Sequence, residues 1–199
     1  EVEEGYFTWL VLPRHGLLKA GRFRSSMGSF NRNHPPETTF ADRPRVFTDF
    51  LGSEGLVGNG LSVAYLLPIR NIFAEWTFEL TDVWAGAPAF GDINATTGLL
   101  ETGGSRQKLG VLTRIASSHD FTESLTMLGG VSYAEGATDA AGGGAGRILG
   151  VDFRIKHQNP REAQYRSIDS RNEFFLVHSE RTTGTANVGE REPGSDRRW

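Results

Sequence analysis

Charged side chains stand at regular positions inside apolar segments, and they are the residues best suited to chemistry in this sequence. In the segment 149–156, Asp152 and Arg154 alternate with Val151 and Phe153. Because successive side chains of a β-strand point to opposite faces, such a segment has one apolar face and one charged face. Charges that line a wet face can set the ion preference of a pore, so the sequence indicates the handling of ions or solutes.

Other reactive residue types do not form a catalytic arrangement. Ser118, His119 and Asp120 are adjacent, and we expect them in a tight turn, where they cannot build the relay of nucleophile, base and orienting group. Glu75 and Glu79 are four residues apart on one strand face, about 13 Å, which is beyond the carboxylate spacing of glycosidases. The sequence has no Cys, which excludes thiol catalysis, thiolate zinc sites and disulfides. We therefore expect no enzymatic activity and no cofactor.

Histidine gives a weak metal signal. The histidines of three different predicted turns would be about 10 Å apart, whereas a metal ion binds a His nitrogen at about 2 Å. In the longest predicted loop, His34 lies near Glu37 and Asp42. We predict no metal site, with His34, Glu37 and Asp42 as weak candidates for a cation.

Alternation with a period of two recurs along the chain and predicts about eight strands. They cover residues 4–12, 17–24, 58–67, 71–83, 108–117, 123–134, 147–156 and 164–180. Short and long connections alternate, with long loops near 25–57, 84–107 and 135–146 and a polar tail at 181–199. The pattern predicts an all-β fold, an antiparallel up-and-down meander that forms a single segment over residues 1–199.

Such a meander can close into a membrane barrel or into a soluble one. In a membrane barrel the apolar face meets lipid and the polar face lines a wet lumen, whereas a soluble barrel has the opposite sidedness. The predicted strands are mostly about 8–13 residues long, while globular strands are nearer 5–6 and membrane strands need about 9–11. All short turns fall at one end of the sheet and all long loops at the other, as in outer-membrane barrels. We therefore expect a transmembrane β-barrel or an open part of a larger one.

Composition excludes some classes of protein. The net charge of -3 argues against a nucleic-acid binder, which would carry a basic face. No apolar run reaches the roughly 18 residues that a transmembrane helix needs. The acidic first residues predict no signal peptide at this start. A mean hydropathy of -0.35 fits strands with one polar face as well as it fits a soluble protein.

More specific motifs lie in the first 70 residues. The sequence Leu18-Lys19-Ala20-Gly21-Arg22-Phe23-Arg24 leads into a long loop, and Gly52-Ser53-Glu54-Gly55-Leu56-Val57-Gly58-Asn59-Gly60 leads out of it. This region resembles porin-like outer-membrane proteins of Gram-negative bacteria, similar to phosphate-selective porins, some of whose relatives are labelled zinc-regulated TonB-dependent receptors. Ser53 interrupts the motif that this family has before its next strand.

The resemblance implies a channel in the outer membrane of a Gram-negative bacterium that lets small polar or anionic solutes diffuse passively. Its partners would be membrane lipid and those solutes, and a homo-oligomer is compatible with it. Family members are larger barrels, and residues 194–199 are typical of a polar loop rather than a closing strand, so we expect a fragment. The alternatives are a soluble or surface β-barrel that binds a ligand, and the barrel fragment of a TonB-dependent receptor.

Charges on strand interiors are the predicted pore-lining residues. Arg22 and Arg24 lie where the second strand enters the longest loop, which we expect to fold inward as a constriction. Cross-strand ion pairing is the structural alternative for all of them. The full set is Lys19, Arg22, Arg24, Glu75, Glu79, Arg114, Asp152, Arg154, Lys156, Arg171 and Glu173.

Overall fold

A computed structural model gives the fold of the chain. It describes residues 4–12, 15–32, 44–70, 72–82, 84, 86–93, 100–102, 109–138, 144–158, 167–181 and 194–196.

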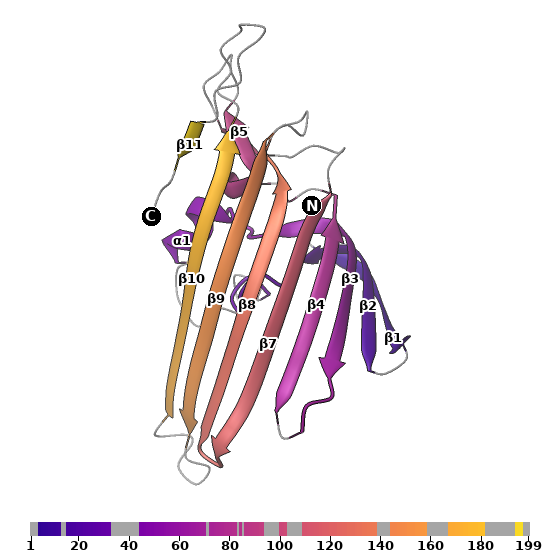
Figure 1. The fold of residues 1–199 in the computed structure, drawn as a ribbon, viewed down its shortest axis with the longest axis vertical. Coiled ribbons are helices and arrows are strands. Elements are labelled where there is room, and N and C mark those ends of the chain that lie inside the picture. Colours follow the sequence, from indigo (N-terminus) through magenta and orange to yellow (C-terminus); the bar gives the residue numbers. More distant parts are fainter. Residues whose placement is uncertain are drawn as a thin grey trace, which may run out of the picture.

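The fold is all-β, and one large sheet holds nearly all of its strands (Figure 1). Nine strands lie in the order of the sequence, every described neighbour pair is antiparallel, and the sheet is open, with β1 and β11 at its ends. The strands are β1 Gly5–Leu12, β2 Gly16–Arg24, β3 Val57–Leu67, β4 Phe73–Thr81, β7 Gly110–Thr122, β8 Leu125–Ala137, β9 Ala145–Gln158, β10 Ser167–Arg181 and β11 Gly194–Asp196. The predicted up-and-down meander is confirmed, and each of the eight predicted strands is present.

Strand bounds differ from the prediction at the short-turn end. The predicted turn around His119 belongs to β7, where His119 pairs with Met127 of β8 across a connection of only two residues, Glu123 and Ser124. Continuing the ladder pairs backbone groups that a longer turn would leave to water. At the other end, β8 reaches Ala137 and β9 begins at Ala145, so the third long loop is shorter than expected.

The predicted polar tail also contains a strand. Residues Gly194–Asp196 form β11, and Ser195 pairs with Glu180 of β10. The tail has no apolar alternation, so the pattern that finds the long strands had nothing to detect here.

Long connections carry short elements of their own. The loop between β2 and β3 contains α1 Arg45–Phe50, and the loop between β4 and β7 contains the 3-10 helix η2 Pro88–Phe90 and a hairpin of β5 Gly91–Ile93 with β6 Leu100–Thr102. Figure 1 draws α1 behind the sheet beside β10, where the Phe47 ring meets the Phe175 ring edge-on at 5.5 Å. No helix in the described part of the chain is long and apolar enough to cross a membrane.

A compact apolar core fills one face of the sheet near its long-loop end. The loops contribute Phe47, Trp84 and Phe90, and the sheet contributes Leu112 and Ile148. Because a strand alternates its faces, Leu112 shares a face with Arg114, two residues further along β7. The loops therefore fold back over the face of the sheet that carries the charges, which we call the inner face.

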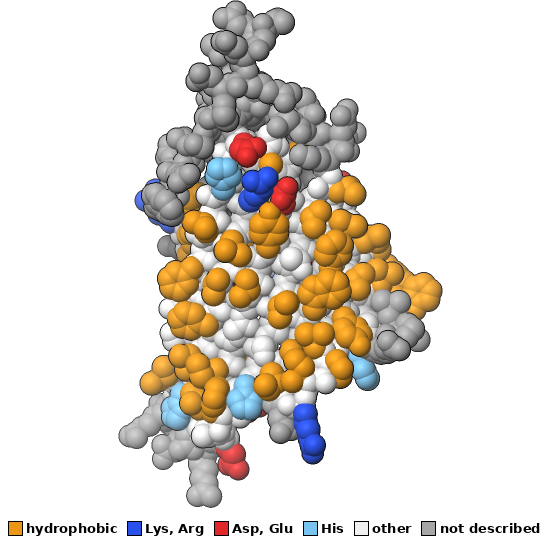
Figure 2. Space-filling model, in the orientation of Figure 1, with side chains coloured by type: hydrophobic (Ala, Val, Ile, Leu, Met, Phe, Trp, Pro, Cys, Tyr) orange, Lys and Arg blue, Asp and Glu red, His pale blue; other side chains and the backbone are white. Residues whose placement is uncertain are grey.

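The opposite, outer face is apolar and exposed. Its exposed side chains include Trp76, Ile115, Val131, Val151 and Phe174. Figure 2 shows hydrophobic side chains spread across the sheet, with charged residues and histidines gathered toward the two ends of the strands. The sequence-based expectation of one apolar and one polar face is confirmed, and the loops cover the polar one.

Candidate functional site

An arginine in the middle of the sheet organises the inner face. Arg114 of β7 is almost fully buried and donates two hydrogen bonds to the carboxylate of Asp152 on β9, at 2.6 and 2.9 Å. It also donates to the hydroxyl of Ser132 on β8, which lies between them, at 2.7 Å. The strand between the two charges has Gly130 opposite Asp152, and a Cβ there would lie 2.4 Å from the guanidinium. The missing side chain at Gly130 leaves room for the bidentate ion pair between Arg114 and Asp152. Both charges are buried, and buried charges need such a partner.

Residues 25–32, which we call the strap, cross the inner face directly after β2. Two carboxylates on distant strands hold its backbone. Glu79 of β4 accepts from the N–H of Ser26 at 3.1 Å, and Glu173 of β10 accepts from the N–H of Ser29 at 2.6 Å and the N–H of Phe30 at 2.8 Å. These bonds give partners to the buried Glu79 and the half-buried Glu173, and they fix the path of the strap from β4 to β10.

The strap also holds its own shape. Asn31 is fully buried and donates from its amide to the carbonyls of Ser25 and Leu56, while its side-chain oxygen accepts from the N–H of Leu56 at 2.9 Å. Gly28 has φ of 65°, a left-handed conformation that glycine adopts without steric cost. The described first part of the loop after β2, residues 25–32, is thus a defined structure that crosses the inner face.

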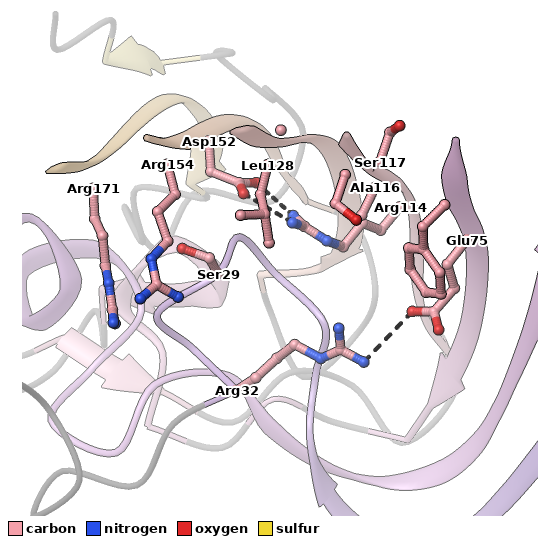
Figure 3. Close-up of a pocket in the computed structure, with 13 residues that line it drawn as sticks. Ser29, Arg32, Glu75, Arg114, Ala116, Ser117, Leu128, Asp152, Arg154 and Arg171 are labelled. Carbon is pink, nitrogen blue, oxygen red and sulfur yellow. Dashed lines mark hydrogen bonds and ion pairs between the residues drawn. The ribbon is translucent and has the colours of Figure 1, made fainter. Parts of the chain in front are cut away.

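A cavity of about 430 Å³ lies between the strap and the sheet (Figure 3). Strap residues Ser29 and Arg32 form one side, and β4, β7, β8, β9 and β10 form the other. Most of its charged lining comes from arginine: Arg32, Arg114, Arg154 and Arg171, together with the carboxylates of Glu75 and Asp152. The arrangement offers several N–H donors to a small solute.

We call Arg114, Arg154 and Arg171, which line the sheet side of the cavity, the wall arginines. Two of them share one carboxylate. Arg154 of β9 makes a bidentate ion pair with Asp169 of β10, in which the Nε of Arg154 lies 2.7 Å from a carboxylate oxygen. Arg171 reaches the same carboxylate at 3.2 Å. One carboxylate therefore serves two guanidinium groups, which leaves this part of the wall electropositive.

The structure brings five of the predicted pore-lining residues to the cavity and distributes the others. The five are Glu75, Arg114, Asp152, Arg154 and Arg171. Glu79 and Glu173 hold the strap instead. These seven residues come from β4, β7, β9 and β10.

The remaining predicted residues lie away from the cavity. The ammonium of Lys19 sits 4.4 Å from the ring centre of Tyr6, and Lys156 pairs in register with Asp169. Arg22 is half-buried opposite Asn59, and the Arg24 side chain is 2% exposed beside Glu54. These four do not line the cavity.

Sequence reasoning missed Ser29, Arg32 and Asp169. Asp169 stands near the start of a long strand whose charges were already noted, so alternation from Arg171 could have placed it on the same face. The strap has no period of two, and only its small residues around Gly28 hint at a tight path.

The weak metal candidates His34, Glu37 and Asp42 lie outside the described residues. Within the part of the chain that the structure covers, no group of three or more His, Asp or Glu side chains is placed to hold a metal ion.

Comparison with known proteins gives one relative without an assigned role. No protein-family model matches the chain, and no solved structure matches it. The chain is similar to an uncharacterized protein of Aquifex aeolicus (strain VF5), with 32% identity over 169 residues. The match covers 78% of this chain and 35% of the relative, so the chain spans about a third of the length of the curated protein it matches.

Proposed function

We propose that this chain forms part of the wall of a porin-like β-barrel in the outer membrane of a Gram-negative bacterium, which passes small polar or anionic solutes by diffusion. One observation carries the proposal: the exposed face of the sheet is apolar, while the charged face is turned toward the folded-in loops. That sidedness is the one a membrane barrel needs. A soluble ligand-binding barrel would have its apolar face inside and its charges in water.

The height of the apolar face agrees with this proposal. On β9 the outer side chains Leu149, Val151, Phe153 and Ile155 form an apolar row between Arg147 and His157. The ten steps from Arg147 to His157 correspond to about 33 Å along a strand, or about 25 Å of height at a tilt near 40°. The apolar band of outer-membrane barrels is about 25 Å tall.

A polar group on the outer face has a partner within the sheet. The indole N–H of Trp76 donates to the hydroxyl of Thr113 at 3.0 Å, and that hydroxyl lies 3.4 Å from the carbonyl of Thr77. Such internal pairing matters in lipid, where water is not present to bind an open donor.

The charge of the cavity supports an anionic solute. Four guanidinium groups, those of Arg32, Arg114, Arg154 and Arg171, stand against the carboxylates of Glu75, Asp152 and Asp169. Among the six charged residues that line the cavity, four are arginines and two are acids, and charges that line a pore set its ion preference.

The test is electrical. The full-length protein that contains this chain is purified in detergent and added to planar lipid bilayers in potassium chloride. We expect stepwise conductance increases that scale with protein dose. A protein that remains monodisperse in buffer without detergent and yields no conductance steps at high dose would overturn the proposal and favour the soluble barrel.

A further inference from the structure

Arg32 differs from the other cavity arginines in where it comes from. Arg114, Arg154 and Arg171 belong to the long strands β7, β9 and β10, whereas Arg32 ends the strap. Figure 3 shows its side chain reaching across the cavity from the strap toward Glu75, on the side opposite Arg154 and Arg171. A solute in the cavity would therefore have Arg32 on one side and the arginine wall on the other.

Arg114 and Arg154 are the most tightly held of the wall arginines. Arg114 has three hydrogen bonds between 2.6 and 2.9 Å to Asp152 and Ser132. Arg154 donates to both carboxylate oxygens of Asp169, and Arg171 lies 3.2 Å from one of those oxygens. An incoming anion would have to break these short, charge-assisted bonds to bind the wall through the same N–H groups.

The pair of Arg32 is loose by comparison. Its guanidinium is 3.7 Å from a carboxylate oxygen of Glu75, which is an ion pair without a hydrogen bond of normal length. The side chains of Arg32 and Glu75 are 48% and 26% exposed. An open ion pair of this kind contributes little free energy, so a competing anion can take the place of the carboxylate.

We propose that Arg32 is the exchangeable anion contact of this protein, and that Glu75 is its built-in competitor. A small anion entering the cavity replaces Glu75 beside the guanidinium, and the carboxylate returns when the anion leaves. This inference rests on the proposed channel function and adds to it the residue that sets charge selectivity. The exchangeable contact is then a side chain that the strap, rather than the sheet, positions.

The two members of the pair should shift selectivity in opposite directions. Chloride is the probe, and the readout is the ratio of anion to cation permeability from reversal potentials in a potassium chloride gradient across a planar bilayer. A unit charge about 5 Å from the path of an ion in watery surroundings corresponds to about a fourfold change in local ion concentration. We expect Arg32→Gln to lower the ratio about fourfold and Glu75→Gln to raise it by a similar factor.

Two further variants separate this role from a structural one. Arg70 lies in the exposed turn before β4, so Arg70→Gln makes the same charge change away from the cavity and should leave the ratio unchanged. Arg32→Lys keeps the positive charge but not the planar guanidinium, and it should retain most of the anion-to-cation permeability ratio. If Arg32→Gln fails to fold, Glu75→Gln still gives a result, because its expected shift is upward.

Failure of this inference is distinct from failure of the proposed function. A wild-type protein without conductance contradicts the channel itself. Conducting variants in which Arg32→Gln and Glu75→Gln leave the ratio unchanged, or move it in the same direction, overturn the role of the pair and leave the channel standing.

Discussion

The hold of Glu173 on the strap can be tested by removing its acceptor. One oxygen of Glu173 accepts from the N–H of Ser29, the hydroxyl of Ser29 and the N–H of Phe30, at 2.6, 2.6 and 2.8 Å. Hydrogen bonds to a charged group contribute about 1.5–3 kcal/mol each, and neutral ones about 1 kcal/mol. Because the three bonds share one oxygen, Glu173→Ala should destabilise docking of the strap by about 3–5 kcal/mol rather than by their full sum.

Hydrogen exchange measures this docking directly. Each 1.4 kcal/mol is a factor of ten, so protection of the amides in the peptide 25–32 should fall by a factor of about 100 to 4,000 in Glu173→Ala. Glu173→Gln keeps an acceptor oxygen but not the negative charge, so protection of the same amides should fall about tenfold. The exchange is followed by mass spectrometry on the detergent-solubilised full-length protein.

A matched control makes the outcome decisive. Glu123 lies in the exposed turn between β7 and β8, so Glu123→Gln removes one carboxylate without touching the strap. Amide hydrogen exchange in the strap peptide of Glu123→Gln should equal that of the wild type. If Glu173→Ala also retains full protection, the carboxylate does not hold the strap and the reasoning fails.

Three further predictions concern the strap, the inner ion pair and the outer face. Gly28→Ala puts a Cβ 2.5 Å from Glu173 at a φ of 65°, so strap protection should fall at least tenfold, and unchanged exchange would contradict this close approach. Arg114→Gln leaves Asp152 buried without its charge partner and should lower the free energy of unfolding by about 3–5 kcal/mol in urea titrations. The double variant Arg114→Met with Asp152→Leu should recover much of that loss, whereas an equally unstable double variant would argue against an unpaired charge as the cause. Val151→Arg places a charge on the outer face and should cost about 2–4 kcal/mol of folding free energy in lipid vesicles, while no loss there would argue against lipid contact.

Sequence alone determined the eight long strands and which of their residues share a face. The alternation that places Asp152 and Arg154 opposite Val151 and Phe153 is local, and it survives in β9 with the expected faces. A period of two follows from the geometry of a single strand, so no knowledge of its neighbours is needed. The same local rule identified five of the residues that line the cavity.

Tertiary structure decided which charges meet and what covers them. Ser26 and Glu79 are 53 residues apart in the sequence, and Ser29 and Glu173 are 144 apart. No periodicity records such distant bonds, because the strap is neither helix nor strand and its path depends on carboxylates from two strands on either side of the sheet centre. For the same reason Arg32 was not predicted: its place in the cavity is set by the strap, and the strap is set by the folded sheet.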